Sequence, residues 1–114
     1  MSYDYDVLVI GGGAGGLSAA GIATHFGAKT AMIERDALGG DGTWTGCGPS
    51  KTFLKAAKVA KQARTASTYG LIDQDIEIDC SGVMEHVRSV REEVYHDADR
   101  PEIFKEMGID VHDG

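Results

Sequence analysis

Cysteine, proline and tryptophan are scarce in this sequence, and long hydrophobic runs are missing. Its 114 residues include two cysteines, two prolines and one tryptophan. Two cysteines are too few for a disulfide scaffold, so we expect a reducing compartment, the cytoplasm. No stretch approaches the roughly eighteen apolar residues of a membrane helix, and the acidic N-terminus MSYDYDV lacks the basic and apolar regions of a signal peptide. We therefore expect no membrane partner.

Positive charge is also in deficit. Lysine and arginine number 11 against 18 aspartates and glutamates, which gives a net charge of −7. A chain with this balance and no basic stripe is poorly suited to bind nucleic acid or an anionic membrane surface. The length is that of one modest domain, and a hydrophobic content of 42% is ordinary for a globular protein. We expect a small molecule as the partner.

Glycine, by contrast, is abundant and clustered. The chain has 16 glycines, and they gather at 11–16, 39–42 and 46–48 rather than along a flexible linker. Clustered glycine brings backbone close to another group, because no Cβ stands in the way. The three clusters are therefore the first places to look for a binding site.

The N-terminal part of the sequence, as far as Glu34, predicts a βαβ unit. The short apolar run DVLVI at 6–10 is typical of a buried parallel strand. Residues 17–28 have apolar side chains at helical spacing and end at Gly27, a suitable glycine after a helix C-terminus. Residues 29–34 form the second predicted strand, and the crossover between the two strands should be right-handed.

The remaining residues predict more helices and a third strand. Pro49 suits the first turn of a helix, and Asp79 or Ser81 could cap another. The charged run VREEVYHDADR at 90–100 predicts a solvated helix face. The expected elements are a loop at 36–46, a helix at 47–66, an extended segment at 71–79, a helix at 82–96, a short helix at 100–107 and a strand at 109–112. The predicted fold class is α/β, a parallel sheet with flanking helices.

Three glycines after the first strand follow the GxGxxG pattern of dinucleotide-binding folds. Gly11 allows the tight turn, Gly13 lets a pyrophosphate approach the backbone, and Gly16 allows close helix–strand packing. The amides around Ala14 and Gly15 lie where a helix N-terminus attracts an anion. A glycine-rich turn can also serve structure alone, but here a strand precedes it and a helix follows.

An acidic residue completes the dinucleotide pattern. Glu34 ends the second strand, about 20 residues beyond the glycines, where a carboxylate binds ribose hydroxyls. The alternative is an ordinary surface glutamate. A carboxylate would repel a 2′-phosphate, which leaves FAD or NAD, although the neighbouring Arg35 could accept such a phosphate. The glycine pattern does not separate FAD from NAD.

The second glycine cluster resembles the flavin loop of the pyridine nucleotide–disulfide oxidoreductases. The residues that carry the resemblance are GG at 39–40 and WTGCGPSK at 44–51, and it covers essentially the whole chain. Dihydrolipoamide dehydrogenase, glutathione reductase and mercuric reductase are members, and the segment at 92–111 looks most like the mercuric-reductase-like branch. The resemblance implies a Rossmann-like fold, bound FAD, NAD(P)H as co-substrate, and a homodimer for the full-length parent. It identifies residues 1–114 as the N-terminal part of an FAD-binding domain, with the nicotinamide-binding and dimerisation domains outside this chain.

Residue by residue, the loop matches the family form GG-x-C-x-N-x-G-C-V-P-S-K except at a few positions. Trp44 stands where many members have asparagine, Gly42 replaces the first redox cysteine, and Gly48 replaces a valine. Cys47 matches the flavin-side thiol, the catalytic candidate, and Lys51 lies near the reactive edge of the flavin in relatives. The cofactor-binding residues that the resemblance and the glycine pattern imply are Gly11, Gly13, Ala14, Gly15, Gly16, Glu34, Arg35, Gly39, Gly40, Asp41, Gly46, Cys47, Lys51 and Gly114.

The glycine at position 42 determines which functions remain open to Cys47. Without a side chain there, Cys47 has no disulfide partner in the loop, and Cys80 has no motif around it. Dithiol exchange needs two thiols, so the dithiol chemistry of relatives is in doubt. The alternatives are a flavin oxidase or peroxidase that uses Cys47 alone, or a non-catalytic FAD-binding module. Cys47 could also be a small buried hydrophobe. The histidines and cysteines show no spacing typical of a metal site.

Overall fold

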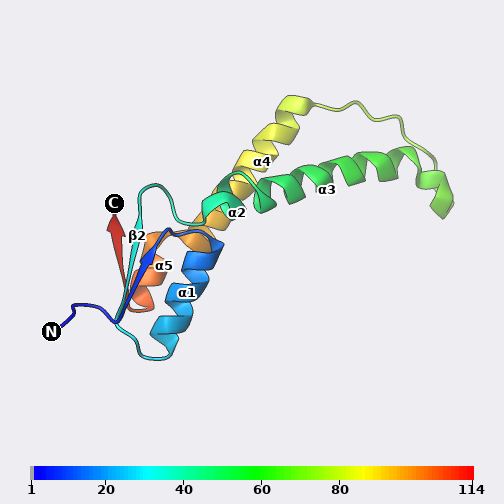
Figure 1. Cartoon of the computed structure of the whole chain (residues 1–114). Coiled ribbons are helices and arrows are strands. Elements are labelled where there is room, and N and C mark those ends of the chain that lie inside the picture. The colour runs from blue at the N-terminus through cyan, green and yellow to red at the C-terminus, as the bar shows by residue number, and fades with distance from the viewer. Residues whose placement is uncertain (1) are drawn as a thin grey trace.

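A three-stranded parallel sheet lies at one end of the molecule (Figure 1). The computed structural model describes residues 2–114. The sheet order is β1-β2-β3, so β2 is central, and its residue Met32 pairs with Val9 on one side and Val111 on the other. The strands are β1 (Val7–Ile10), β2 (Thr30–Glu34) and β3 (Ile109–Asp113). Their β-branched and apolar residues favour this pleated, half-buried environment.

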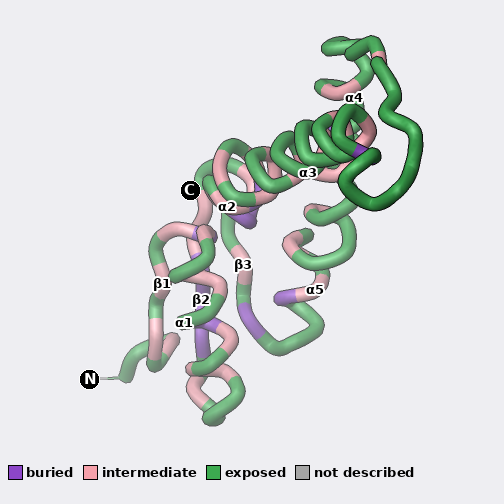
Figure 2. The backbone as a smooth tube through the Cα atoms, turned by 90° about the vertical axis from the view of Figure 1, so that its right-hand side faces the viewer, coloured by how far each residue is buried: buried purple, intermediate pink, exposed green. Residues whose placement is uncertain are grey.

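Two helices pack against the sheet. They are α1 (Ala14–His25) and α5 (Pro101–Glu106), and in Figure 1 both lie on one side of the strands. The buried cluster between helices and sheet consists of Ala20, Met32, Leu38, Phe104 and Ile109. Figure 2 shows that buried residues concentrate in this part of the chain, which we call the body. The body is thus a small two-layer α/β unit, as the sequence predicts.

The opposite face of the sheet is open. Leu8 is 55% exposed and Ile10 is 82% exposed, whereas Val7 and Val9 between them are half-buried. Side chains alternate between the two faces of a strand, so β1 buries one face only. The parallel strand predicted at 6–10 is present, and among residues 2–114 no described segment covers its second face.

A long arm extends from the body (Figure 1). We define the arm as α3 (Cys47–Arg64), the 3-10 turn η1 (Ala66–Tyr69), the irregular crossing 70–79 and α4 (Cys80–Val94). The chain runs outward along α3 and returns along α4. The molecule measures 72 × 26 × 18 Å as a result. Over residues 2–114, no helix has both the length and the apolarity needed to cross a membrane.

Several predicted element boundaries differ from the structure. The first helix begins at Ala14 rather than residue 17, because the glycines at 15 and 16 form its first turn. The predicted loop at 36–46 contains a short helix, α2 (Gly40–Trp44). The predicted helix at 82–96 begins at Cys80, after Asp79 at the N-cap, and changes at Tyr95 into a π-helical turn, η2 (Tyr95–Asp99). The shifts lie where glycine or a local turn competes with helical periodicity.

Candidate functional site

The turn between β1 and α1 is built on glycines. Gly11 has φ +97°, a left-handed conformation that side chains rarely adopt, and its amide donates to the Ile33 carbonyl at 2.8 Å. A Cβ on Gly16 would overlap the Gly11 carbonyl oxygen, so this helix turn packs directly on the end of the strand. Gly13 is the N-cap of α1. A Cβ on Gly13 would have the Gly40 Cα as its nearest neighbour, at 3.9 Å, so there is free space beside Gly13. The turn can therefore admit a ligand beside Gly13.

The first turn of α1, which follows this glycine turn, is partly exposed to solvent. Ala14 and Gly15 are exposed, and the described first turn carries no acidic side chain. The first amides of a helix have no partner within the helix and favour negative charge. The sequence-predicted residues at 11–16 are therefore brought together as a candidate anion-binding turn.

Glu34 is tied to the glycine turn. Its Oε2 accepts a hydrogen bond from the Gly12 amide at 2.6 Å, and its Oε1 accepts one from the Asp36 amide at 2.9 Å. These amides, Asp36 first and Gly12 next, lower the pKa of Glu34 below its ordinary value of 4.5. Glu34 is half-buried, so it is not an ordinary surface glutamate. A carboxylate has about four acceptor positions, so acceptor capacity remains on Glu34 for a ligand hydroxyl.

Two further predicted site residues lie close to Glu34: Arg35 follows it in the sequence, and Gly114 contacts it in the fold. The exposed Arg35 directs its Nε to Asp36 at 3.3 Å. The exposed Gly114, just after β3, donates its amide to the Glu34 carbonyl at 3.2 Å. The carboxyl ends of β2 and β3 thus meet beside the glycine turn, at the edge where open α/β sheets bind ligands.

The two glycine motifs touch one another. The Gly39 amide donates to the Gly12 carbonyl at 2.9 Å. A Cβ on Gly40 would lie only 2.8 Å from the Gly13 Cα, so backbone packs on backbone at this point. Two clusters that lie far apart in the sequence therefore form one continuous surface, consistent with the prediction that both serve one ligand.

The start of α3 places the predicted thiol at the surface. Cys47 is the first residue of α3 and is exposed, which excludes the alternative of a buried hydrophobe. Lys51, one turn later on the same helix face, is also exposed. Asp41 closes the turn before Cys47 with two hydrogen bonds. Its backbone carbonyl accepts one from the Gly46 amide at 2.5 Å, and its side-chain Oδ1 accepts one from the Thr45 hydroxyl at 2.9 Å.

Gly42 and Gly48 are neighbours in space. A Cβ on Gly42 would meet nothing within 4 Å, whereas a Cβ on Gly48 would lie 3.2 Å from the Gly42 carbonyl oxygen. Both cysteines, Cys47 and Cys80, are free and exposed. Among residues 2–114 no group of three or more histidine, cysteine or acidic side chains could hold a metal ion.

Comparison with known proteins decides the family. A family model described as pyridine nucleotide-disulphide oxidoreductase matches residues 5–110, nearly the whole chain. The chain belongs to the pyridine nucleotide-disulphide oxidoreductases. The family resemblance and the partial Rossmann-like fold that the sequence predicts are both confirmed.

Relatives within the pyridine nucleotide-disulphide oxidoreductases have several names. A dihydrolipoyl dehydrogenase of Bacillus subtilis (strain 168) is 34% identical over 114 residues, 100% of this chain and 24% of that protein. A mercuric reductase of Staphylococcus aureus is 37% identical over 112 residues, 95% of this chain and 20% of that protein. A glutathione reductase of Yarrowia lipolytica (strain CLIB 122 / E 150) is 48% identical over 71 residues, 62% of this chain and 15% of that protein. The chain spans about a quarter or less of these relatives, and the mercuric-reductase-like branch stays a prediction.

Some residues that hold the segment 38–44 in place were not predicted from the sequence. The buried Thr43 donates its hydroxyl to the Asp99 carboxylate, and the Trp44 Nε1 donates to the Leu38 carbonyl at 2.8 Å. Asp99 lies in the charged run that predicts a solvated face, and that prediction is wrong for Asp99 because it is half-buried. A spacing of four from Tyr95 to Asp99 was the available signal.

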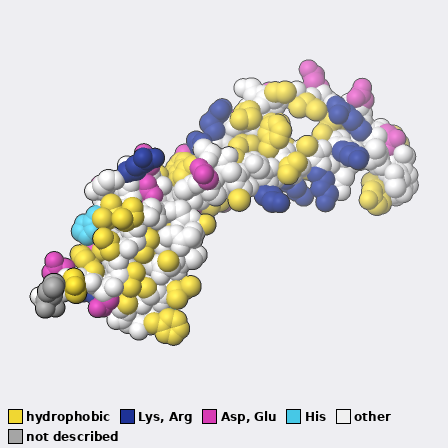
Figure 3. All heavy atoms as spheres, viewed as in Figure 1, with side chains coloured by type: hydrophobic (Ala, Val, Ile, Leu, Met, Phe, Trp, Pro, Cys, Tyr) yellow, Lys and Arg dark blue, Asp and Glu magenta, His cyan; other side chains and the backbone are white. Residues whose placement is uncertain are grey.

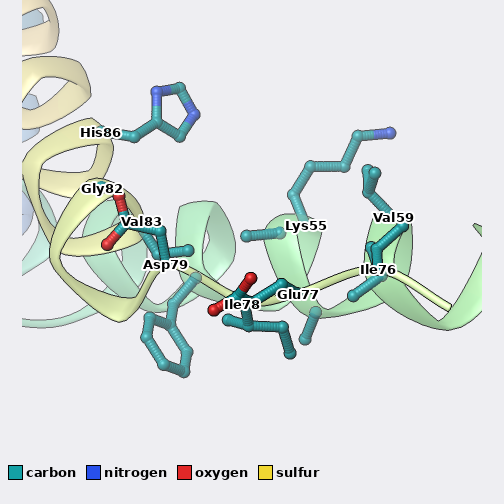
Figure 4. Close-up of a pocket in the computed structure, with 13 residues that line it drawn as sticks. Lys55, Val59, Ile76, Glu77, Ile78, Asp79, Gly82, Val83 and His86 are labelled. Carbon is teal, nitrogen blue, oxygen red and sulfur yellow. The ribbon is translucent and has the colours of Figure 1, made fainter.

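A cavity of this pyridine nucleotide-disulphide oxidoreductase lies elsewhere, on the arm. Figure 3 shows hydrophobic side chains around the opening between α3 and the returning chain. The cavity has a volume of about 800 Å³, and in Figure 4 side chains of α3, the crossing 70–79 and α4 border it. Its lining includes Lys55, Val59, Ile76, Ile78, Val83 and His86. None of the sequence-predicted site residues lines it, so it is separate from the candidate site.

Proposed function

We propose that this chain is the FAD-binding part of a flavin-dependent NAD(P)H oxidoreductase that acts on a disulfide or a related small-molecule acceptor. The observation that carries the proposal is the contact between the two glycine motifs, Gly39 with Gly12 and Gly40 with Gly13. A single extended ligand can lie along both motifs only if they are continuous. Members of the family use FAD and NAD(P)H, and FAD has the length that such a surface requires.

Each part of the surface has a proposed role toward FAD. The turn at 11–16 receives the pyrophosphate on backbone amides, and Glu34 receives the adenosine ribose hydroxyls on its free acceptor positions. Gly114 lies beside Glu34, where the adenine end would follow. The 39–41 turn and the start of α3, with Cys47 and Lys51, lie toward the isoalloxazine end. Bound FAD supplies the electron transfer between nicotinamide and acceptor.

The other parts of the activity are assigned outside these residues. The chain covers about a quarter or less of the relatives compared, so we infer that nicotinamide binding and homodimer formation belong to segments not included in residues 1–114. We also infer a cytoplasmic location, since Cys47 and Cys80 are both free thiols. Turnover of NADH with a disulfide or a dye is expected to be absent from the 114 residues alone.

Titration with FAD tests the proposal. Gly13→Ala adds a methyl group that meets no protein atom closer than 3.9 Å, yet it occupies the place through which a pyrophosphate approaches. We expect the wild-type chain to bind FAD with quenched flavin fluorescence, and Gly13→Ala to bind at least about tenfold more weakly. Gly21→Ala, also in α1 with ordinary contact at 3.7 Å, is the matched control and should bind normally. Equal binding by all three proteins, or no binding by wild type, would contradict the proposal.

A second candidate function follows from the exposed, unpaired Cys47. Hydrogen peroxide can transfer one oxygen to a lone thiolate, which gives a sulfenic acid and hydroxide. Two electrons, from reduced flavin or from two external thiols that become a disulfide, restore the thiol and release the oxygen as water. Trapping of sulfenate on Cys47 in a Cys80→Ser protein would favour this oxidase or peroxidase function. Bound FAD with an inert Cys47 would instead favour a non-catalytic FAD-binding module.

A further inference from the structure

One face of α4 continues into η2 and contacts the loop at 38–44. Among residues 91–100, only Arg91, Tyr95 and Asp99 are not exposed. They follow one another at intervals of four, the spacing that puts helical residues on one face. We call these three residues the ridge. All three side chains approach α2, the short helix directly before Cys47, although they lie far beyond it along the chain.

Two members of the ridge enclose the indole of Trp44. The Tyr95 ring lies with its centroid 5.0 Å from that of Trp44, and the Arg91 guanidinium lies 5.3 Å from the Trp44 ring. The Arg91 Nε is buried and has no hydrogen-bond partner among the described residues, while another nitrogen of the same guanidinium lies 3.7 Å from the Glu92 carboxylate. The face of the guanidinium packs against the Trp44 ring. Trp44 in turn binds the Leu38 carbonyl through Nε1, which closes the loop on itself.

Asp99 binds α2 near its C-terminal end and approaches Gly39, the N-cap residue of the same helix. It accepts the hydroxyl of the buried Thr43, and its Oδ2 would lie 2.7 Å from a Cβ on Gly39. Gly39 has φ +101° and Gly40 has φ +55°, so the turn depends on conformations that a free glycine-rich chain populates only in part. A helix of five residues is too short to be stable alone. External contacts must therefore hold this segment, and Asp99 supplies one through its hydrogen bond with Thr43.

We propose that Arg91, Tyr95 and above all Asp99 are positioning residues for the FAD loop. They hold residues 38–44 against the glycine turn before the ligand arrives, so that FAD binding does not bear the cost of ordering the loop. The inference rests on the proposed function, since it assigns the loop to FAD. It adds that the end of α4 and the following η2, and not only the two glycine motifs, determine affinity for the flavin.

Trp44 provides a direct readout, because it is the only tryptophan of the chain. We expect Asp99→Ala to shift Trp44 emission to longer wavelength with no ligand present, as the indole gains contact with water. Thr43→Val removes the hydroxyl at nearly constant volume and should give the same shift. Thr43→Ser keeps the hydroxyl and should restore wild-type emission. Asp73→Ala is the matched control, because Asp73 accepts the Ser67 hydroxyl at 2.9 Å far out on the arm.

Flavin binding is the second readout. Asp99→Ala and Thr43→Val are each expected to weaken FAD binding about tenfold, and the double variant no more than either alone, because both remove one interaction. Visible circular dichroism of the bound flavin should change in both variants and stay normal in Thr43→Ser and Asp73→Ala. Unchanged Trp44 emission and unchanged FAD affinity in Asp99→Ala would overturn the inference while leaving the proposed function intact. A wild-type chain that binds no FAD would overturn both, whatever the emission of Trp44.

Discussion

At the scale of single residues, Glu34 connects the sheet to the glycine turn through its charge. Its pKa is lowered by amide donors from Asp36 and Gly12, so the folded protein binds this proton less tightly than the unfolded chain. The resulting stability is complete above pH 4.5, the ordinary value, and is lost as pH falls through the lower pKa of the folded state. Acid therefore weakens the link between β2 and the candidate pyrophosphate site only below that ordinary value.

Glu34→Gln tests that link. The amide can accept only through its one oxygen, so we expect the free energy of unfolding at neutral pH to fall by about 1 kcal/mol. The variant should also lose the part of the acid dependence that lies below pH 4.5, since no carboxylate remains there to protonate. Urea denaturation of both proteins between pH 3 and 7 measures the difference. If the free energies of unfolding of wild type and variant change with pH in parallel, the hydrogen bonds to Gly12 and Asp36 do not make stability depend on the protonation of Glu34.

Position 42 retains room for a side chain. A Cβ there meets nothing within 4 Å, and Gly42 does not have a left-handed backbone. We expect Gly42→Cys, in a Cys80→Ser protein, to change the free energy of unfolding of the reduced form by no more than about 0.5 kcal/mol. Under oxidising conditions the introduced thiol should pair with Cys47, so that thiol titration falls from two groups to none.

A thiol placed elsewhere is the control for this prediction. Ser67→Cys, in the same Cys80→Ser background, puts the second thiol in η1 at the tip of the arm. That protein should keep both thiols when it is diluted and oxidised. If Gly42→Cys also keeps both, the turn at 40–46 does not bring positions 42 and 47 within disulfide distance.

At the scale of elements, the sequence predicts most of the fold because local signals agree with tertiary packing. The βαβ unit, the start of α3 at Cys47 and the end of α5 before Gly108 all carry strong local signals of apolar periodicity or glycine. The helix α2 was missed because its residues GDGTW have low helix propensity. Contacts with the ridge and the glycine turn hold it, and these are long-range.

In the candidate site, too, residues with local sequence signals were predictable and residues held by long-range contacts were not. Gly11, Gly16 and Glu34 were predictable because each role depends on neighbours within a standard unit. Asp99 was not, because a charged residue in a charged run gives no local sign that its partner is Thr43, 56 residues away. The open face of β1 was not predictable either, since an apolar strand has the same composition whether one or both faces are covered.

The arm and the body should differ in local stability. The central strand β2 is buried at Thr30, Ala31 and Met32, whereas the crossing 70–79 is exposed at all residues but one, half-buried Ile76. We expect amide hydrogen exchange at least about a hundredfold slower in β2 than in η1 and the outer turns of α3, because few buried contacts oppose opening of the arm. Mass spectrometry of peptides from the two regions measures this ratio. Equal protection would show that arm and body unfold as one cooperative unit.

At the scale of the whole molecule, the arm sets the shape. The radius of gyration is 20.0 Å. A compact chain of this length would have about 13 Å, and an unfolded one about 34 Å. The three values are far enough apart for small-angle X-ray scattering to separate an extended folded arm from collapse or unfolding. Large apolar side chains on the arm, among them Phe53, Leu54, Ile72 and Met84, are 44% exposed or more and would favour collapse.

We expect scattering from dilute protein to give a radius of gyration close to the 20.0 Å of the structure, because two features oppose collapse of the arm. Lys55, Lys58 and Lys61 lie along α3 without a described ion pair, so docking of α3 on the sheet would require their desolvation. The ridge also fixes the direction of α4 through Tyr95 and Asp99 at the base of the arm. Asp99→Ala should therefore broaden the distribution of distances while the circular dichroism of the helices stays the same. A radius at the compact value for the wild-type protein would contradict this account and place the arm against the open face of β1.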